Sequence, residues 1–193
     1  PFLYIAGDSH SLSPAWRTVE YQGRPHLLRP ALATGCKIWH LRKESDFFPK
    51  ANFEVAISAI PQKSPVIFCF GEIDCREGLL VAVERCRYES LEAGVDFTVG
   101  IYIGKLKQLA RERQFRVMVH PVAPVLNETR HIVKLFNARL AAAVRAEPDL
   151  LYLDFFDELL SPDGNALADG LALDGTHLHP DYVKLLEKAL PAV

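Results

Sequence analysis

The chain has 193 residues, 49% of them hydrophobic and 24% charged, which is typical of one soluble globular domain with a sizeable core. Its formal net charge is −2, and its Lys and Arg residues are scattered among Asp and Glu, so no basic stripe indicates nucleic acid or an anionic membrane surface. No apolar run approaches the roughly 18 to 20 residues that cross a bilayer. We therefore expect a single domain over residues 1–193 that binds neither nucleic acid nor a membrane.

The sequence contains four cysteines, Cys36, Cys69, Cys75 and Cys86, which lack the spacing of metal ligands. Two of them lie in or beside an apolar run, which favours buried, reduced thiols and a reducing, cytoplasmic compartment. No signal peptide is visible. Because the chain starts at Pro1 directly on an apolar run and without Met, we also expect it to be a segment of a longer protein.

Short apolar runs predict the strands of one sheet. Phe2–Ala6 is rich in aromatic and branched residues and is closed by Gly7, which indicates a buried strand. Ser64–Phe70 is an unbroken apolar run that ends at Gly71, which suits a central strand buried on both faces. Further strands are expected over Gly35–Leu41 (as a strand or as the turn beside one), Phe115–His120 and Leu150–Phe155.

Alternating residues over Thr18–Leu28 predict a small hairpin that turns at Gln22 and Gly23. Proline cannot donate a hydrogen bond to a neighbouring strand, so Pro25 is expected to confine the second arm of this hairpin to a sheet edge.

Helical periodicity fills most of the remaining chain. Gly94 is expected to stop one helix, and Asn127 to cap another in which Ile132, Phe136 and Leu140 recur at helical spacing. The other predicted helices cover Phe53–Ile60, Leu79–Glu92, Val95–Arg113 and Asp181–Leu190. Strands that alternate with helices predict an α/β fold, here a flavodoxin-like three-layer α/β/α sandwich with a mainly parallel five-stranded sheet.

Two short polar motifs carry the candidate chemistry. Asp8 and Ser9 follow the first predicted strand, at the sheet edge where α/β proteins bind ligands. Asp174 and His177 lie just before the last predicted helix. A serine hydroxyl becomes a good nucleophile when an imidazole within hydrogen-bond reach accepts its proton, and a carboxylate three residues before the histidine can orient that imidazole. The alternative is structural: Asp-Ser as a helix cap, and Asp-Gly with His-Pro as an ordinary turn.

Three motifs in order resemble sequence blocks of the SGNH (GDSL-type) hydrolase superfamily: Gly7-Asp8-Ser9, Gly71-x-x-Asp74 and Asp174-x-x-His177. The resemblance covers essentially the whole chain. It implies a catalytic triad of Ser9, Asp174 and His177, and hydrolysis of a small-molecule ester through an acyl-enzyme, without a cofactor or a metal ion.

The third block departs from the family pattern. The superfamily usually has Gly-x-Asn-Asp there, with the Asn side chain donating to the oxyanion hole, whereas this chain has Ile73 at that position. One such donor contributes about 3 to 4 kcal/mol to transition-state stabilisation. The candidate replacements are the side chains of Arg76, His120 and Asn127 and the backbone amides of Ser9 and Gly35.

Several residues near these motifs allow more than one interpretation. Glu72 and Arg76 form either an internal ion pair or, together with Asp74, a site for a polar substrate, and His120 is expected to contact the substrate or the oxyanion. His10 either lines the pocket or lies on the surface. Less favoured alternatives are Cys75 as the nucleophile and a metal cluster of Asp174, His177, His179 and Asp181.

Polar and charged residues at the predicted strand ends favour an O-acyl group on a small polar or carbohydrate alcohol as the substrate. The same residues also suit an acyltransferase, in which an alcohol other than water accepts the acyl group. Because Ile73 replaces an oxyanion donor, a catalytically weak ligand-binding module is a further alternative. The sequence does not indicate an oligomeric state.

Overall fold

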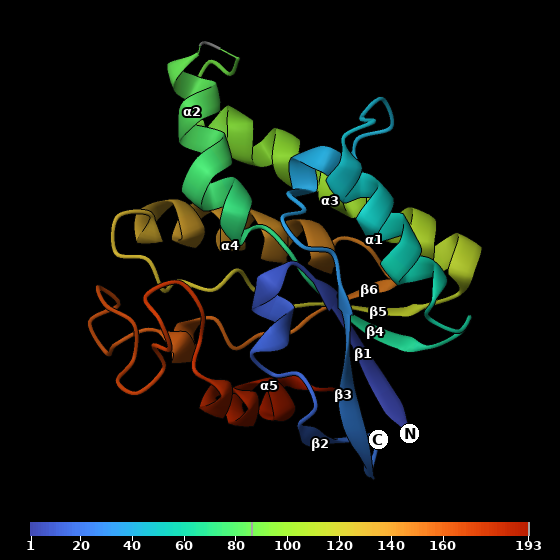
Figure 1. Cartoon of the computed structure of the whole chain (residues 1–193). Coiled ribbons are helices and arrows are strands. Elements are labelled where there is room, and N and C mark those ends of the chain that lie inside the picture. The colour runs from blue at the N-terminus through green and yellow to red at the C-terminus, as the bar shows by residue number, and fades with distance from the viewer. Residues whose placement is uncertain (86, 193) are drawn as a thin grey trace.

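The computed structural model, which describes residues 1–85 and 87–192, contains one six-stranded sheet in the order β2-β3-β1-β4-β5-β6. Five strands are parallel, and β2 pairs antiparallel with β3 at one edge (Figure 1). The prediction of a mainly parallel sheet is confirmed, with six strands in place of five. The strands are β1 (Phe2–Gly7), β2 (Thr18–Tyr21), β3 (Arg24–Leu32), β4 (Pro65–Cys69), β5 (Arg116–Val119) and β6 (Leu150–Tyr152).

The helices cover both faces of the sheet, which gives the predicted three layers. They are α1 (Phe48–Ser58), α2 (Leu79–Glu84), α3 (Leu91–Arg113), α4 (Arg130–Arg145) and α5 (Val183–Ala189). Figure 1 shows α1, α3 and α4 on one side of the sheet and α5, with the segment that leads to it, on the other. No helix in the described ranges is both long and apolar enough to cross a membrane.

Each face of the sheet has its own hydrophobic core. Tyr4 and Ala6 of β1 face the core under α1, α3 and α4, whereas Leu3 and Ile5 face the core under α5. Side chains alternate between the two faces of a strand, so a strand that is buried on both sides needs apolar residues at every position. This explains the unbroken apolar run at the start of the sequence.

The predicted hairpin forms, but its second arm is not at an edge. Strand β3 lies between β2 and β1, with Pro25 opposite Glu20 of β2. The amide of Leu27 points toward β1 and donates to the Pro1 carbonyl. The nitrogen of Pro25, two residues earlier, points the same way but lies beyond the end of β1, so its missing N–H costs no ladder hydrogen bond.

The second strand of the parallel sheet is therefore β3, and Gly35–Leu41 is not a strand. Its second half, Ile38–Leu41, is a 3₁₀ turn beside the sheet, so only the alternative of a turn is confirmed.

Several helix boundaries also differ from the prediction: α2 ends at Glu84 and not at Glu92, and α1 covers Phe48–Ser58 in place of Phe53–Ile60. Helix α3 begins at Leu91, where the Ser90 side chain accepts a hydrogen bond from Ala93, so Gly94 lies inside its first turn. A β-carbon at Gly94 would approach a ring carbon of Tyr88 to 2.9 Å, so glycine serves packing there and does not stop a helix. Asn127 does not cap α4, because the residue at the N-cap position is Thr129; the Asn127 side chain accepts a hydrogen bond from the Arg130 guanidinium.

The three cysteines among the described residues, Cys36, Cys69 and Cys75, are free and buried. Burial raises the pKa of the Cys36 thiol to about 12 and those of the Cys69 and Cys75 thiols well above the usual range. Thiols in that state are poor nucleophiles, which argues against Cys75 in that role. Cys86 lies outside the described residues.

Candidate active site

Strand β1 delivers Asp8 and Ser9 to its carboxyl end. Gly7 is required just before them, because a β-carbon there would lie 2.5 Å from the Cys69 carbonyl oxygen of β4. The chain then enters a 3₁₀ turn over Ser9–Leu12, capped by the Asp8 carboxylate, which accepts the backbone amide of His10 at 2.9 Å. Ser9 is therefore held at a rigid strand end and is half-buried.

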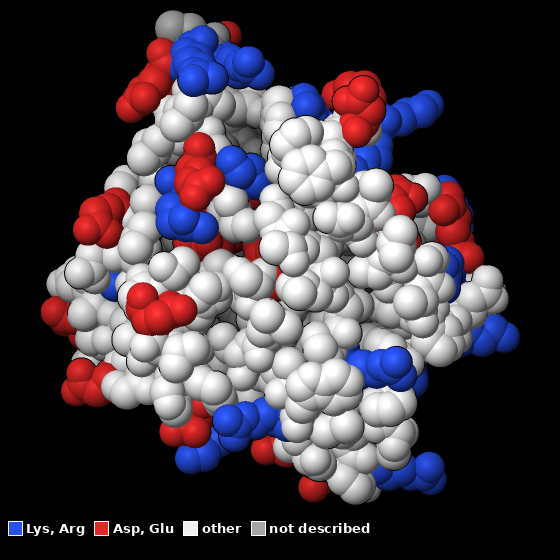
Figure 2. Space-filling model, viewed as in Figure 1, with Lys and Arg blue, Asp and Glu red and all other residues white. Residues whose placement is uncertain are grey.

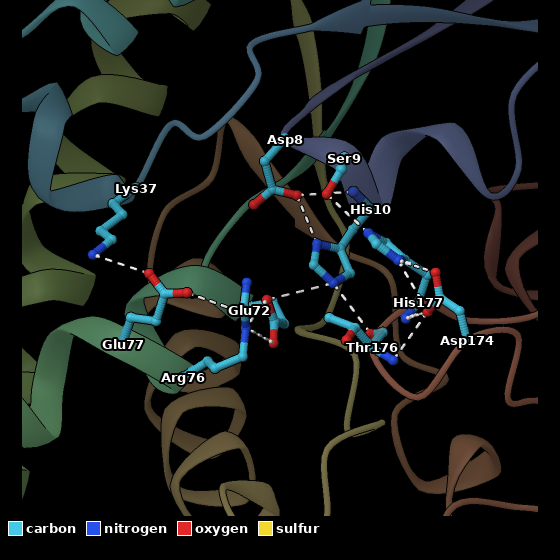
Figure 3. Close-up of polar contacts among 10 residues, drawn as sticks. All are labelled: Asp8, Ser9, His10, Lys37, Glu72, Arg76, Glu77, Asp174, Thr176 and His177. Atoms are coloured by element: carbon cyan, nitrogen blue, oxygen red, sulfur yellow. Dashed lines mark hydrogen bonds and ion pairs between the residues drawn. The ribbon is translucent and has the colours of Figure 1, made fainter.

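His177 approaches Ser9 from a loop near the other end of the chain. Its Nε2 lies 2.9 Å from the Ser9 Oγ, and its Nδ1 lies 2.8 Å from Oδ2 of Asp174. Figure 3 shows the imidazole between the hydroxyl and the carboxylate. The structure thus brings together the three residues predicted for a triad.

The Asp174 carboxylate accepts hydrogen bonds from the backbone of the loop that carries it. Its Oδ1 accepts the amides of Thr176 at 3.0 Å and of His177 at 2.8 Å. Gly175, which lies between Asp174 and Thr176, has a φ of +82°, which glycine adopts without steric cost. The hydrogen bonds from the amide and side chain of His177 and from the Thr176 amide lower the pKa of Asp174 to about 2, so it is a carboxylate at neutral pH.

A second series of charged groups runs beside the first. Asp8 Oδ1 lies 2.8 Å from Nδ1 of His10, whose Nε2 lies 3.5 Å from Oε2 of Glu72. Arg76 Nε donates to both Glu72 oxygens, at 3.0 and 3.3 Å, and Arg76 Nη1 donates to Glu77 at 2.7 Å. Figure 3 shows this series side by side with the Ser9 to Asp174 series. The alternative of an internal ion pair between Glu72 and Arg76 is the arrangement present.

His10 was not predicted to be more than a pocket or surface residue. It is only 6% exposed, its Nε2 lies 3.3 Å from the Thr176 carbonyl oxygen, and its ring centroid is 4.6 Å from that of His177. No local pattern signals this position, because the groups that surround His10 come from opposite ends of the chain.

Asp74, predicted beside the substrate, is engaged elsewhere. It is 2% exposed, and its two oxygens accept the backbone amides of Ile38 and Trp39. The carboxylate therefore fixes the 3₁₀ turn Ile38–Leu41 rather than pointing toward Ser9.

His120 is buried against Phe155 and against Tyr182, in the turn that precedes α5, which argues against the expected contact with substrate. Its Nδ1 lies 2.6 Å from the Pro121 carbonyl oxygen and its Nε2 lies 3.1 Å from the Tyr182 hydroxyl, so both ring nitrogens are used. Burial lowers its pKa to about 4, and His120 is neutral at physiological pH.

Gly35 lies in an exposed turn just past β3, with a φ of +67°. The turn is tied to β1 two residues earlier, where the Ala33 amide donates to the Gly7 carbonyl at 2.8 Å. Asn127 is exposed and bonded to Arg130, whereas Arg76 belongs to the second charged series in Figure 3.

The face in Figure 2 carries mixed positive and negative side chains in its upper left part and is hollowed beside α2. A cavity of about 230 Å³ lies there, between the turn Ile38–Leu41, α2 and α3, and its lining includes the aromatic side chains of Trp39 and Tyr88 and the charged groups of Lys37 and Glu77. Ser9 is not among the described residues that line it. The cavity adjoins the second charged series through Glu77.

No family model and no curated protein sequence matches the chain. Solved structures do match over nearly all of it. An acetyl xylan esterase aligns with a TM-score of 0.60 and 14% identity over 97% of each chain. A lipase from a goat rumen metagenome aligns with a TM-score of 0.58 and 13% identity, over 98% of this chain and 95% of that one.

A GDSL-like lipase from Bacteroides thetaiotaomicron aligns with a TM-score of 0.56 and 17% identity, over 97% of this chain and 84% of that one. Identities this low leave the likeness at the level of the fold. The fold that the sequence motifs implied is therefore confirmed: this chain has the α/β/α fold of the SGNH (GDSL-type) hydrolase superfamily.

Proposed function

We propose that this chain is a serine ester hydrolase in which Ser9 is the nucleophile, His177 the general base and Asp174 the group that orients the base. The observation that carries the proposal is the unbroken hydrogen-bonded series from the Ser9 hydroxyl through the imidazole to a carboxylate, at 2.9 and 2.8 Å. These three side chains lie at the carboxyl end of a central parallel strand, where α/β folds bind their ligands.

In this mechanism the Ser9 Oγ attacks the ester carbonyl carbon while His177 Nε2 takes the hydroxyl proton. The tetrahedral intermediate collapses to an acyl-enzyme, and His177 returns the proton to the leaving alcohol. Water then repeats the same steps on the acyl-enzyme and releases the acid. Asp174 keeps the Nδ1 proton of His177 on the side away from Ser9, so Nε2 is free to accept.

The oxyanion is best served by backbone donors, because Ile73 has no N–H in its side chain. Ser9 is the first residue of its 3₁₀ turn, so its amide has no acceptor inside the turn. We assign this amide as one donor, and the Gly35 amide as a second at the neighbouring strand end.

For the substrate we propose an O-acyl group on a small polar or carbohydrate alcohol. The charged groups beside the triad and the aromatic side chains of Trp39 and Tyr88 in the nearby cavity suit a polar alcohol with a sugar-like ring face. One similar structure is that of an acetyl xylan esterase, although others are those of lipases. An acyltransferase on the same triad differs only in the acceptor of the acyl group.

The experiment is labelling with a fluorophosphonate, followed by mass spectrometry of the labelled peptide. Ser9 is expected to carry the label, and Ser9→Ala is expected to abolish both labelling and turnover of an aryl acetate. The half-buried Ser13→Ala variant is the control and is expected to match the wild type. Wild-type turnover in Ser9→Ala would remove the assignment, and product analysis with an added acceptor alcohol separates hydrolysis from transfer.

A further inference from the structure

His10 is a buried histidine whose side-chain partners are all acceptors. Its Nδ1 faces Asp8 Oδ1 at 2.8 Å, and its Nε2 faces the Thr176 carbonyl oxygen at 3.3 Å and Glu72 Oε2 at 3.5 Å. A backbone carbonyl has no proton to give, so Nε2 must carry one. Asp8 Oδ1 already accepts the His10 amide, so Nδ1 is a donor as well.

We infer that His10 is an imidazolium that acts as a positioning residue for the proposed reaction. It donates from one ring nitrogen to the nucleophile turn and from the other to the loop that carries the base. The inference rests on the proposed function, because the loop in question is the one that holds His177.

This loop has little else to hold it against the nucleophile turn. Residues 172–175 are exposed, and the loop's own ties are local, such as the bond from the Leu173 amide to the His177 carbonyl. Among the described residues, two kinds of contact bridge it to the nucleophile turn. One is the bond between Ser9 and His177, and the other is made by His10, through the Thr176 carbonyl and the ring contact with His177.

The surroundings favour a charged His10. Burial lowers the pKa of His10. The hydrogen bond to Asp8, the charges of Asp8 and Glu72 and the hydrogen bond to the Thr176 carbonyl together raise it by more, so the pKa of His10 lies above the ordinary value. The positive charge of His10 also compensates the negative charge of Asp8, whose second oxygen is buried without a hydrogen-bond partner among the described residues. The titratable and charged groups around His10 come from every neighbouring element and are Asp8, Glu72, Arg76, His120, Asp174 and His177.

The ring of His10 also packs against the ring of the proposed base. The two ring centroids are 4.6 Å apart, so His10 helps to set the position of the imidazole whose Nε2 lies 2.9 Å from the Ser9 hydroxyl.

The test compares His10→Gln, which keeps a donor but not the charge, with wild type and with His131→Gln, an exposed histidine on α4. For His10→Gln we expect kcat/KM to fall by roughly 10- to 100-fold through misplacement of the base. We expect this fall in kcat, with KM within about twofold of the wild type, because His10 holds the base and not the substrate. His131→Gln is expected to match the wild type in both.

A purely structural role for His10 would lower the stability of the variant without lowering kcat of the folded protein, so a fall carried by KM alone would overturn the positioning of the base. Unchanged kcat/KM would overturn the positioning role.

Nitrogen-15 NMR of the wild-type imidazoles tests the charge without any substitution. Both His10 ring nitrogens are expected to be protonated at pH 7, and a neutral tautomer there contradicts the inference even where His10→Gln fails to fold. This measurement is independent of turnover. If Ser9 is not labelled but His10 is protonated, the proposed reaction is contradicted while the charge of His10 stands.

Discussion

The buried carboxylate of Asp74 accepts a hydrogen bond from the backbone amide of Ile38 at 2.8 Å, across 36 residues of sequence. Its second oxygen accepts the Trp39 amide at 3.1 Å. The motif that follows β4 thus fixes the segment between β3 and α1, which forms one wall of the 230 Å³ cavity. In this chain the motif shapes the surroundings of the proposed site through the backbone.

The first prediction concerns the pH dependence of stability. Burial raises the pKa of Asp74 to about 7, although the amides of Ile38 and Trp39 and the charge of Lys37 lower it. A carboxyl whose pKa is higher in the folded state than in the unfolded chain binds more protons when folded. Its contribution to stability is therefore full below about pH 4, where the unfolded group titrates, and is lost as pH rises through about 7.

Replacing Asp74 with Asn removes this contribution, so the loss in free energy of unfolding is expected to be larger at pH 5 than at pH 8. Urea unfolding at the two pH values measures it, with Asp96→Asn on the exposed face of α3 as the control. An equal loss at both pH values would show that Asp74 is ionised throughout this range.

The second prediction concerns the proposed base. Only a neutral imidazole accepts the serine proton, so kcat/KM is expected to rise with pH within the range from about 5 to 8 in which histidine titrates. A rate independent of pH over that range argues against a histidine base.

The third prediction tests the orienting carboxylate. In Asp174→Asn the side-chain oxygen still accepts the two loop amides, but the negative charge beside Nδ1 of His177 is gone, so kcat/KM is expected to fall by about 100-fold or more. The matched control is Asp163→Asn, because Asp163 is also an exposed aspartate that accepts a nearby backbone amide, that of Asn165. A similar fall in both variants would mean that loop geometry alone is responsible.

Short-range patterns predicted most of the fold and the three residues Ser9, Asp174 and His177, whose side chains meet. The apolar run before Gly7 and the spacing of Asp174 and His177 are local features, which are visible in the sequence without knowledge of the fold. The position of β3 was missed because proline in a strand is typical of a sheet edge, and Pro25 was interpreted in that way. Its missing N–H costs little because the nitrogen lies beyond the end of β1, and the residues around Pro25 do not show where β1 ends.

The errors within the site have a similar origin. His120 and Asp74 both follow buried strands, as Ser9 does, and strand-end position alone cannot separate a side chain that faces solvent from one that faces the core. The direction is set by the partner, the Tyr182 hydroxyl in one case and the Ile38 amide in the other. His10 was undervalued because its importance depends on Glu72 and Thr176, which are distant in sequence.

The fourth prediction concerns the Glu72 and Arg76 pair. Burial raises the pKa of Glu72, and the charges of His10 and Arg76 oppose that rise. In Arg76→Ala the Glu72 carboxylate, whose side chain is 6% exposed, keeps only the 3.5 Å contact with His10. We expect a loss of about 1 to 3 kcal/mol in the free energy of unfolding, with lower turnover because His10 is disturbed.

Arg111→Ala serves as the control for this loss, because Arg111 also pairs with a glutamate, at 3.5 Å, but is 79% exposed, and pairs of that kind contribute little. Equal effects in the two arginine variants would mean that Glu72 does not depend on Arg76.

The last prediction returns to Ile73, the residue that departs from the family pattern. Ile73 is 8% exposed and lies between Glu72, which pairs with Arg76, and Asp74, which holds the Ile38 amide. In Ile73→Asn the amide side chain is expected to stay buried without a partner and to lower the free energy of unfolding by about 1 to 3 kcal/mol, with no gain in turnover. Ile73→Val, which removes one methylene, is the packing control and should cost about 0.5 to 1.5 kcal/mol. If Ile73 merely marks a lost oxyanion donor, the asparagine should instead raise turnover, by up to about 10²- to 10³-fold, at unchanged stability. That result would contradict our assignment of the oxyanion contacts to the backbone amides of Ser9 and Gly35.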